Sequence, residues 1–187
     1  MLNAAQSPLY RDLERILLTR EQIRRRIDEI GEALTRDFQG KDLVCVCILK
    51  GAAPFFSDMI RAIDLPLRVD FMSISSYGSA TKSSGVVRIL KDLDRDIVGQ
   101  HVLIIEDIVD SGLTLSFLKQ NLLARGAASL SVCTLLDKPG RRKVALTPDY
   151  CGFEIEDAFV VGYGLDYAER YRNLPDIGVL KPEVYTS

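Results

Sequence analysis

The chain has few of the residues that build zinc sites or catalytic triads. Its 187 residues include a single histidine, His101, and no CxxC pair, so few ways to assemble a zinc site remain. A Ser-His-Asp mechanism has only this histidine, which lies at a Gly-Gln-His turn, and we set nucleophilic catalysis of that type aside. Buried, reduced thiols that pack as small hydrophobic side chains are expected at all the cysteines. These are Cys45, Cys47, Cys133 and Cys151.

Long apolar runs and a large excess of one charge are also absent. No apolar stretch approaches the roughly 18 residues that span a bilayer, and no apolar run follows the N-terminus. The formal net charge is −2, which gives no broad attraction to nucleic acid or to an anionic membrane. Two basic clusters, at 24–26 and 141–143, are interpreted as solvated helix and loop faces. We therefore expect a cytoplasmic protein that binds neither nucleic acid nor membrane.

The apolar pattern predicts strands that alternate with helices in one domain spanning residues 1–187. Thr19 and Gln22 form a capping box before a helix whose apolar residues recur at spacings of three and four up to Phe38. Apolar runs predict strands at 43–49, 69–75, 86–90, 102–105 and 129–136, and helical spacing recurs at 55–63 and 115–123. This alternation predicts an α/β fold with a doubly wound, mostly parallel central sheet and flanking helices.

Ligands of such sheets bind at the carboxyl ends of the strands, near the switch in strand order. Four sequences with distinctive chemistry are expected there: LKG at 49–51, EDIVDSGLT at 106–114, DKPGRRK at 137–143 and VGYGLDY at 161–167. The polar, Gly- and Ser-rich segment SYGSATKSSG at 76–85 is a candidate mobile loop.

The segment VLIIEDIVDSGLT at 102–114 is the most informative part of the chain. Its acids, in what we expect to be a loop after the strand, are Glu106, Asp107 and Asp110. Carboxylates accept hydrogen bonds from sugar hydroxyls, while Ser111, Gly112 and Thr114 offer donors to a phosphate at a helix N-terminus. The segment therefore predicts a site for a phosphorylated ribose. The simpler alternative is a helix cap with solvated acids, but a cap does not require the preceding acid pair.

This segment resembles the signature of type I phosphoribosyltransferases, which bind 5-phospho-α-D-ribosyl 1-pyrophosphate. From about residue 43 to 180 the chain is similar to the bacterial hypoxanthine-guanine members, through LKG, SYGS, ILKDL, VLIIEDIVDSGLT, LLDKP, GFEI and VVGYGLDYAERYR in order. The resemblance implies Mg²⁺-dependent transfer of phosphoribose to hypoxanthine or guanine, which gives IMP or GMP and pyrophosphate in purine salvage. It also implies a small hood formed by the terminal segments, and a homodimer or homotetramer.

The resemblance also implies a role for each residue at the donor end. Glu106 and Asp107 would accept hydrogen bonds from the ribose hydroxyls, and Asp110 would also serve as general acid/base for the purine. The 5-phosphate would lie against Asp110, Ser111, Gly112, Leu113 and Thr114. Leu113 stands where many relatives have lysine, with modest consequences expected because backbone amides carry most of this cradle. The pyrophosphate would contact Lys50, Gly51, Ser76, Tyr77 and Arg172, with a non-proline cis peptide often preceding the lysine.

The purine end lies in the last third of the chain. By the resemblance, Lys138 donates to the 6-oxo group, Phe159 stacks on the ring, and the backbone of Val160 contacts the base edge. Asp166 lies at this end and reaches a magnesium ion through water, so that the expected metal contacts are Glu106, Asp107 and Asp166. Taken alone, Phe159 and Val160 fit core strand positions.

Two alternatives to this function remain open. One is a purine phosphoribosyltransferase that prefers xanthine, which differs in its contacts at the purine two-position. The other is a non-catalytic regulator that senses phosphoribosyl pyrophosphate and binds nucleic acid, for which the net charge gives little support.

Overall fold

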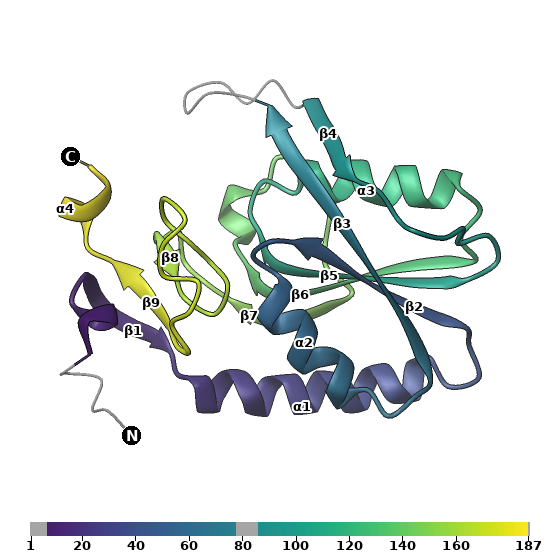
Figure 1. Cartoon of the computed structure of the whole chain (residues 1–187), viewed down its shortest axis with the longest axis horizontal. Helices are drawn as coiled ribbons and strands as arrows, with labels where there is room; N and C mark the ends of the chain where they lie inside the picture. The colour runs from purple at the N-terminus through teal and green to yellow at the C-terminus, as the bar shows by residue number, and fades with distance from the viewer. Residues whose placement is uncertain (1–6, 78–85, 187) are drawn as a thin grey trace.

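A mostly parallel sheet forms the centre of the computed structural model, which describes residues 7–77 and 86–186. The strands in chain order are β2 (Leu43–Leu49), β3 (Leu67–Tyr77), β4 (Val86–Lys91), β5 (His101–Val109), β6 (Ser129–Asp137) and β7 (Tyr150–Glu154). Their spatial order is β4-β3-β2-β5-β6-β7, and only β4 runs antiparallel to its neighbour (Figure 1). The order reverses between β2 and β5. This switch point is where an open α/β sheet binds its ligand, and the predicted fold class is confirmed.

Helices cover both faces of this sheet. Alternate residues of a strand point to opposite faces, so Cys45 and Cys47 pack into the core under α1 (Arg20–Asp37) and α2 (Ala53–Ala62). Val44 and Val46 pack on the other face, under α3 (Leu113–Ala124). Strands buried on both sides therefore appear in the sequence as continuous apolar runs. No helix in the described ranges is long and apolar enough to cross a membrane.

Helix α1 begins and ends as its sequence predicts. Thr19 Oγ1 accepts from the backbone N–H of Gln22, and the Gln22 side chain accepts from the Thr19 N–H, so the predicted capping box is present. The apolar residues at the predicted spacing are all buried: Ile23, Ile27, Ile30, Leu34 and Phe38. All the cysteines are free thiols, and Cys45, Cys47 and Cys133 are buried as predicted, whereas Cys151 is partly exposed. Burial raises the pKa of the Cys45 thiol to about 12.

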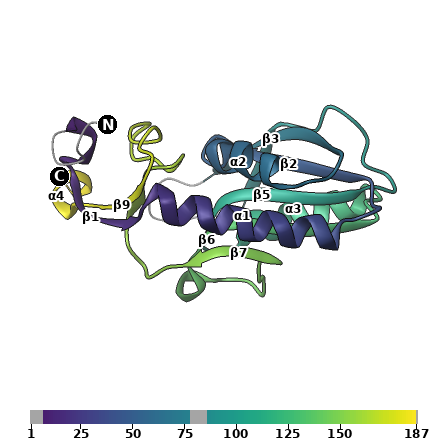
Figure 2. The same ribbon diagram turned by 90° about the horizontal axis from the view of Figure 1, so that it is seen from below.

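A second, smaller sheet lies at one end of the central one. Its order is β1-β9-β8, with β1 (Leu13–Leu18) and β8 (Val160–Val161) each antiparallel to β9 (Ile177–Leu180). The short helix α4 (Pro182–Tyr185) follows β9. Figure 2 shows this sheet beyond the central sheet, with α1 leading from it along the central sheet. It is the hood of terminal segments that the resemblance implied.

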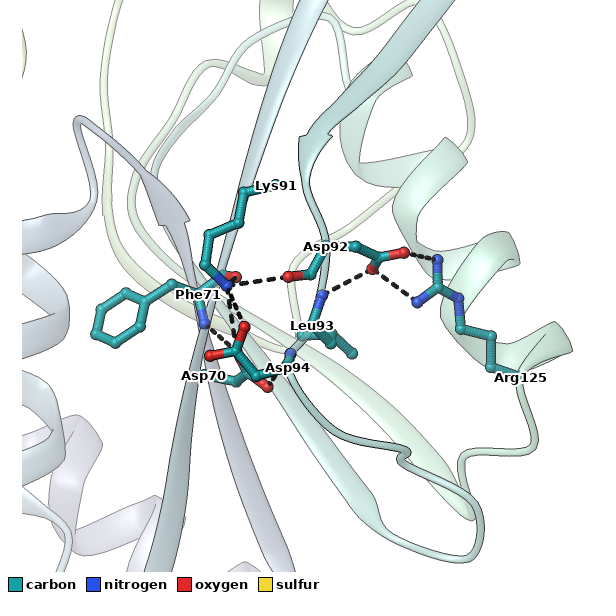
Figure 3. A network of polar contacts seen from close by, with 7 residues as sticks. All are labelled: Asp70, Phe71, Lys91, Asp92, Leu93, Asp94 and Arg125. Carbon is teal, nitrogen blue, oxygen red and sulfur yellow. Dashed lines mark hydrogen bonds and ion pairs between the residues drawn. The ribbon is translucent and has the colours of Figure 1, made fainter.

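Polar contacts fix the edge strand β4 to the rest of the sheet (Figure 3). Lys91 Nζ, at the end of β4, donates to the backbone carbonyl of Asp92 at 3.0 Å and to Asp94 Oδ1 at 2.9 Å. The buried carboxylate of Asp70 on β3 accepts the Asp94 N–H at 2.9 Å. Asp92 in turn binds the Arg125 guanidinium through both oxygens, at 2.7 and 2.8 Å. These bonds join β3, β4 and the C-terminal end of α3.

Candidate active site

The acid pair lies inside β5, and not in a loop after it as the sequence predicted. Glu106 pairs with Thr134 of β6, and the ladder continues as far as Val109 and Asp137. The strand extends past its apolar part because β6 supplies backbone partners for these residues. Since neighbouring strand residues point to opposite faces, the side chains of Glu106 and Asp107 lie on opposite faces of the sheet. The turn after β5 begins at Asp110.

Burial raises the proton affinity of both carboxyls. The pKa of Glu106 is well above its ordinary value, first because of burial and then because of the nearby Asp107 carboxylate. Burial also raises the pKa of Asp107 to about 6, against hydrogen bonds from backbone N–H groups and the Arg172 charge, which lower it. Glu106 Oε2 is buried without a hydrogen-bond partner among the described residues. Such an oxygen is an open acceptor for a ligand hydroxyl.

Two glycines bring the LKG turn and a loop of the hood against Asp107. A Cβ built on Gly51 would lie 1.7 Å from Asp107 Oδ2, and one built on Gly164 would lie 1.9 Å from the Gly51 carbonyl oxygen. Only glycine permits these approaches. The peptide between Leu49 and Lys50 is cis, as the resemblance implied. VGYGLDY thus reaches the site from β8 of the small sheet, and not from a strand of the central sheet.

Cationic side chains gather beside this junction. Lys50 Nζ lies 3.2 Å from Glu169 Oε2, and Arg172 Nη2 lies 2.8 Å from Asp166 Oδ1. Arg172 also donates to the Gly164 carbonyl at 2.8 Å, which ties it to the loop that contacts Gly51. The structure therefore brings together three of the five residues predicted for pyrophosphate. Ser76 and Tyr77 end β3, but their side chains and the loop 78–85 lie outside the described residues.

The turn from Asp110 to Thr114 leads from β5 into α3. Gly112 has φ +79° and is the residue before the helix, and Leu113 is the first helical residue. The turn and Glu106 line a pocket of about 120 Å³ at the N-terminus of α3. Free N–H groups and the helix dipole at such a terminus favour an anion. All five residues predicted for the phosphate, 110–114, are thus in one turn, although Leu113 does not line the pocket.

The loop after β6 braces this turn. Arg142 Nη1 donates to the Asp110 carbonyl at 2.7 Å, and the Lys143 N–H donates to the Ser111 carbonyl at 2.9 Å. The other end of the Arg142 guanidinium is paired with the buried Asp137 carboxylate. The prediction that 141–143 is a solvated face is therefore wrong for Arg142, whose side chain is 14% exposed.

The predicted purine residues lie where β6 meets the hood. Lys138 is buried, and its Nζ donates to the Ala158 carbonyl at 2.7 Å. Phe159 is 39% exposed, and its ring stacks on Tyr185 of α4 at a centroid distance of 4.8 Å. It is therefore not a core residue, whereas Val160 is buried in β8.

The edge of β8 offers backbone groups to a ligand. The Leu180 N–H donates to the Phe159 carbonyl, and backbone groups of successive strand residues point to opposite sides. The N–H and C=O of Val160 therefore point away from β9, along the edge of the sheet β1-β9-β8. This arrangement agrees with a backbone contact to a base edge.

Comparisons with known proteins identify the family. The family model described as "Phosphoribosyl transferase domain" matches residues 15–168. The chain belongs to this family. It is 54% identical to the hypoxanthine-guanine phosphoribosyltransferase of Bacillus subtilis over 94% of this chain and 98% of that protein. It is 56% identical to the enzyme of the same name from Mycobacterium bovis, over 93% of this chain and 89% of that protein.

A solved structure also places the chain among the hypoxanthine phosphoribosyltransferases. The crystal structure of a hypoxanthine phosphoribosyltransferase from Staphylococcus aureus superposes with a TM-score of 0.95 at 53% identity, over 97% of this chain and 99% of that chain. The predicted resemblance to bacterial hypoxanthine-guanine phosphoribosyltransferases, and with it the prediction of an enzyme, is confirmed.

The acids that the sequence predicts as metal contacts do not form a ready-made cage in this phosphoribosyltransferase. In residues 7–77 and 86–186 no group of three His, Cys, Asp or Glu side chains converges on one point. Asp166 instead pairs with Arg172, and its Oδ2 accepts the Glu169 N–H at 2.9 Å. The unpartnered Glu106 Oε2 suits a site in which the substrate supplies most ligands of a hard cation.

Sequence reasoning missed several residues that contact the predicted site. Arg142 carries one local signal, an acid at the end of a buried strand five residues earlier. Arg141 and Asp157, which form an ion pair at 3.0 Å beside the turn, and Tyr185, which stacks on Phe159, carry none, because they meet their partners only through the tertiary fold. Arg26 of the other basic cluster likewise donates to the Gly152 carbonyl at 2.9 Å, so that cluster is not wholly a solvated face.

Proposed function

We propose that this protein is a purine-salvage enzyme of the cytoplasm, which transfers phosphoribose from 5-phospho-α-D-ribosyl 1-pyrophosphate to hypoxanthine or guanine. The products are IMP or GMP and pyrophosphate. The observation that carries the proposal is the junction at the carboxyl ends of β2 and β5. The acid pair Glu106 and Asp107, the LKG turn at 49–51 and the turn at 110–114, here called the phosphate turn, meet there. The names of its relatives support the same reaction.

Each part of the donor has a matching group at this junction. The carboxylates of Glu106 and Asp107 accept hydrogen bonds from the ribose hydroxyls, which are donors. The N-terminus of α3 receives the 5-phosphate, and Lys50 and Arg172 balance the charge of the pyrophosphate as it leaves. The enzyme's main contributions are position and charge stabilisation.

The purine end selects a 6-oxo group. Lys138 is a buried cation with only donor hydrogens, so it matches a carbonyl oxygen and opposes the 6-amino group of adenine. Asp110, at the start of the phosphate turn, holds or accepts the proton that the purine exchanges as its other ring nitrogen attacks the anomeric carbon. Phe159 supplies an exposed aromatic surface for the ring.

Magnesium belongs to this proposal as the cofactor. Glu106, Asp107 and Asp166 are the residues that would hold it, directly or through water. When bound, Mg²⁺ would supply positive charge that offsets the negative charge of the donor's phosphate groups. Transfer should therefore stop when EDTA is added in excess and return with added Mg²⁺; transfer that persists in EDTA would contradict this assignment. We also propose a homodimer or homotetramer, on family grounds, and light scattering at assay concentrations measures it.

A panel of four bases tests the function. The protein is mixed with phosphoribosyl pyrophosphate, Mg²⁺ and one of hypoxanthine, guanine, xanthine or adenine, and nucleotide formation is followed by absorbance. We expect product with hypoxanthine and guanine and none with adenine. A faster reaction with xanthine would favour the xanthine-preferring alternative. No product with any base, together with binding of the donor by calorimetry, would favour the regulator.

A further inference from the structure

Arg141 forms a bridge between two carboxylates at the purine end of the site. Its Nε lies 3.0 Å from Asp110 Oδ1, an ion pair without the geometry of a hydrogen bond. Its Nη1 donates hydrogen bonds to Asp157 Oδ2 at 3.0 Å and to Asp157 Oδ1 at 3.3 Å. The planar guanidinium presents donors in several directions, so one side chain can hold both acids at fixed positions. Sequence reasoning placed this arginine on a solvated face and gave it no function.

The bridge continues to the lysine that selects the purine. Asp157 Oδ1 lies 3.7 Å from Lys138 Nζ, which also donates to the carbonyl of the next residue, Ala158. Charges of alternating sign therefore run from Asp110 through Arg141 and Asp157 to Lys138. The two ends of this run are the groups assigned above to the purine proton and to the 6-oxo group.

The other charges near Asp110 do not duplicate this contact. Glu106 of β5 lines the same pocket, and Arg142 contacts only the backbone carbonyl of Asp110 while its other end pairs with Asp137. Within the part of the chain that the structure describes, Arg141 is the one cation paired with the Asp110 carboxylate. This ion pair is therefore the side-chain charge contact that can orient the Asp110 carboxylate.

Stability does not account for the bridge. The side chains of Arg141, Asp110 and Asp157 are each about half exposed, at 51, 47 and 57%. Ion pairs with this exposure contribute little to the free energy of folding, because water screens the two charges. The bridge lies at the purine end of the site, so a role in the site is the better explanation for it.

We propose that Arg141 is a positioning residue, which holds the Asp110 carboxylate toward the purine and couples it through Asp157 to Lys138. This inference rests on the proposed transfer reaction. A purine that engages Lys138 then meets an acid/base group that is already oriented. Without Arg141 the Asp110 side chain is free to rotate, so both purine binding and the chemical step suffer while donor binding does not.

Kinetics of Arg141→Gln and a matched control test the proposal. Lys143→Gln removes the same charge from the same loop and keeps the backbone N–H that contacts Ser111. The Lys143 side chain is exposed and makes no ion pair with Asp110. We expect Arg141→Gln to lower kcat/KM for hypoxanthine about tenfold, within the range of measured pairwise couplings. The KM for the donor should stay within about twofold, and Lys143→Gln should match the wild type. Arg141→Lys, which keeps a charge that can hold one carboxylate, should restore part of the loss.

A double-mutant cycle tests the coupling itself. If Arg141 acts through Asp157, the effects of Arg141→Gln and Asp157→Asn on kcat/KM for hypoxanthine will not add. Additive effects, or an Arg141→Gln variant that matches Lys143→Gln, would overturn this inference while the wild-type activity stands. A wild-type protein that forms no nucleotide would overturn the proposed function first, so the two failures are distinguishable.

Discussion

A single methyl group at Gly51 should disable the site without unfolding the protein. The added Cβ of Gly51→Ala would lie 1.7 Å from Asp107 Oδ2 and 2.9 Å from its Cγ, whereas real Cβ contacts stay beyond 3.0 Å. The two groups must therefore separate by about 1.3 Å, the difference between 3.0 and 1.7 Å. Asp107 cannot rotate away freely, because its Oδ1 accepts the N–H of Ile108 at 2.8 Å.

The size of the effect follows from this displacement. A misplacement of about 1 Å at a reacting centre can cost roughly 10²-fold in rate, or about 2.7 kcal/mol of transition-state stabilisation. We expect kcat/KM with hypoxanthine and donor to fall by about that factor in a continuous absorbance assay. Gly164→Ala, whose Cβ would lie 1.9 Å from the Gly51 carbonyl oxygen, should act in the same direction.

Gly140→Ala is the matched control. A Cβ at this glycine meets nothing within 4 Å, so its kcat/KM should equal that of the wild type. Circular dichroism and thermal unfolding of all variants show whether the fold is retained. A folded Gly51→Ala protein with wild-type kcat/KM would refute the close contact between the LKG turn and Asp107.

Three further predictions concern stability and purine binding. Burial raises the pKa of Asp107 from 3.8 to about 6, so the charged carboxylate lowers the free energy of unfolding above pH 6. Asp107→Asn should therefore raise the free energy of unfolding of the metal-free protein above pH 6 by up to about 3 kcal/mol, as measured by urea unfolding. This gain should vanish as the pH falls toward 4, where the carboxyl is protonated in both states. Hydrogen bonds from Arg125 lower the pKa of Asp92. Asp92→Asn should therefore cost up to about 1 kcal/mol at pH 7, and this difference should shrink as the pH falls below 4, whereas a constant difference would contradict the pairing. Tyr185→Ala removes the ring stacked on Phe159 and should raise the KM for hypoxanthine about three- to tenfold. Tyr185→Phe, which keeps the ring, should have a KM near that of the wild type. An unchanged KM in Tyr185→Ala would show that the stack does not support purine binding.

The sequence predicts the central sheet well because its signals are local. The apolar runs at 43–49 and 129–136 match β2 and β6 within a residue, and the capping box of α1 is formed by two residues three apart. The strands of the hood cannot be predicted from local patterns in this way. β8 has two residues, and β1 pairs with a strand more than 150 residues away, so neither leaves a periodic pattern of its own.

The same distinction between local and long-range signals applies to the residues of the candidate site. Residues of the phosphate turn are contiguous, and their motif predicts them as a group. The boundary of β5 was misplaced because hydrogen bonding to β6, and not the apolar pattern, decides where the strand ends. The bridge from Asp110 to Asp157 spans 47 positions and depends on the way the loop after β6 folds back, which no spacing in the sequence encodes.

Product analysis tests the central claim most directly. The purified protein is incubated with phosphoribosyl pyrophosphate, hypoxanthine and Mg²⁺, and nucleotide and pyrophosphate are quantified by mass spectrometry and a coupled assay. Transfer of phosphoribose to the purine predicts IMP and pyrophosphate in equal amounts, with the donor and hypoxanthine consumed in the same ratio. Pyrophosphate released without IMP, or no consumption of the donor, would contradict the account.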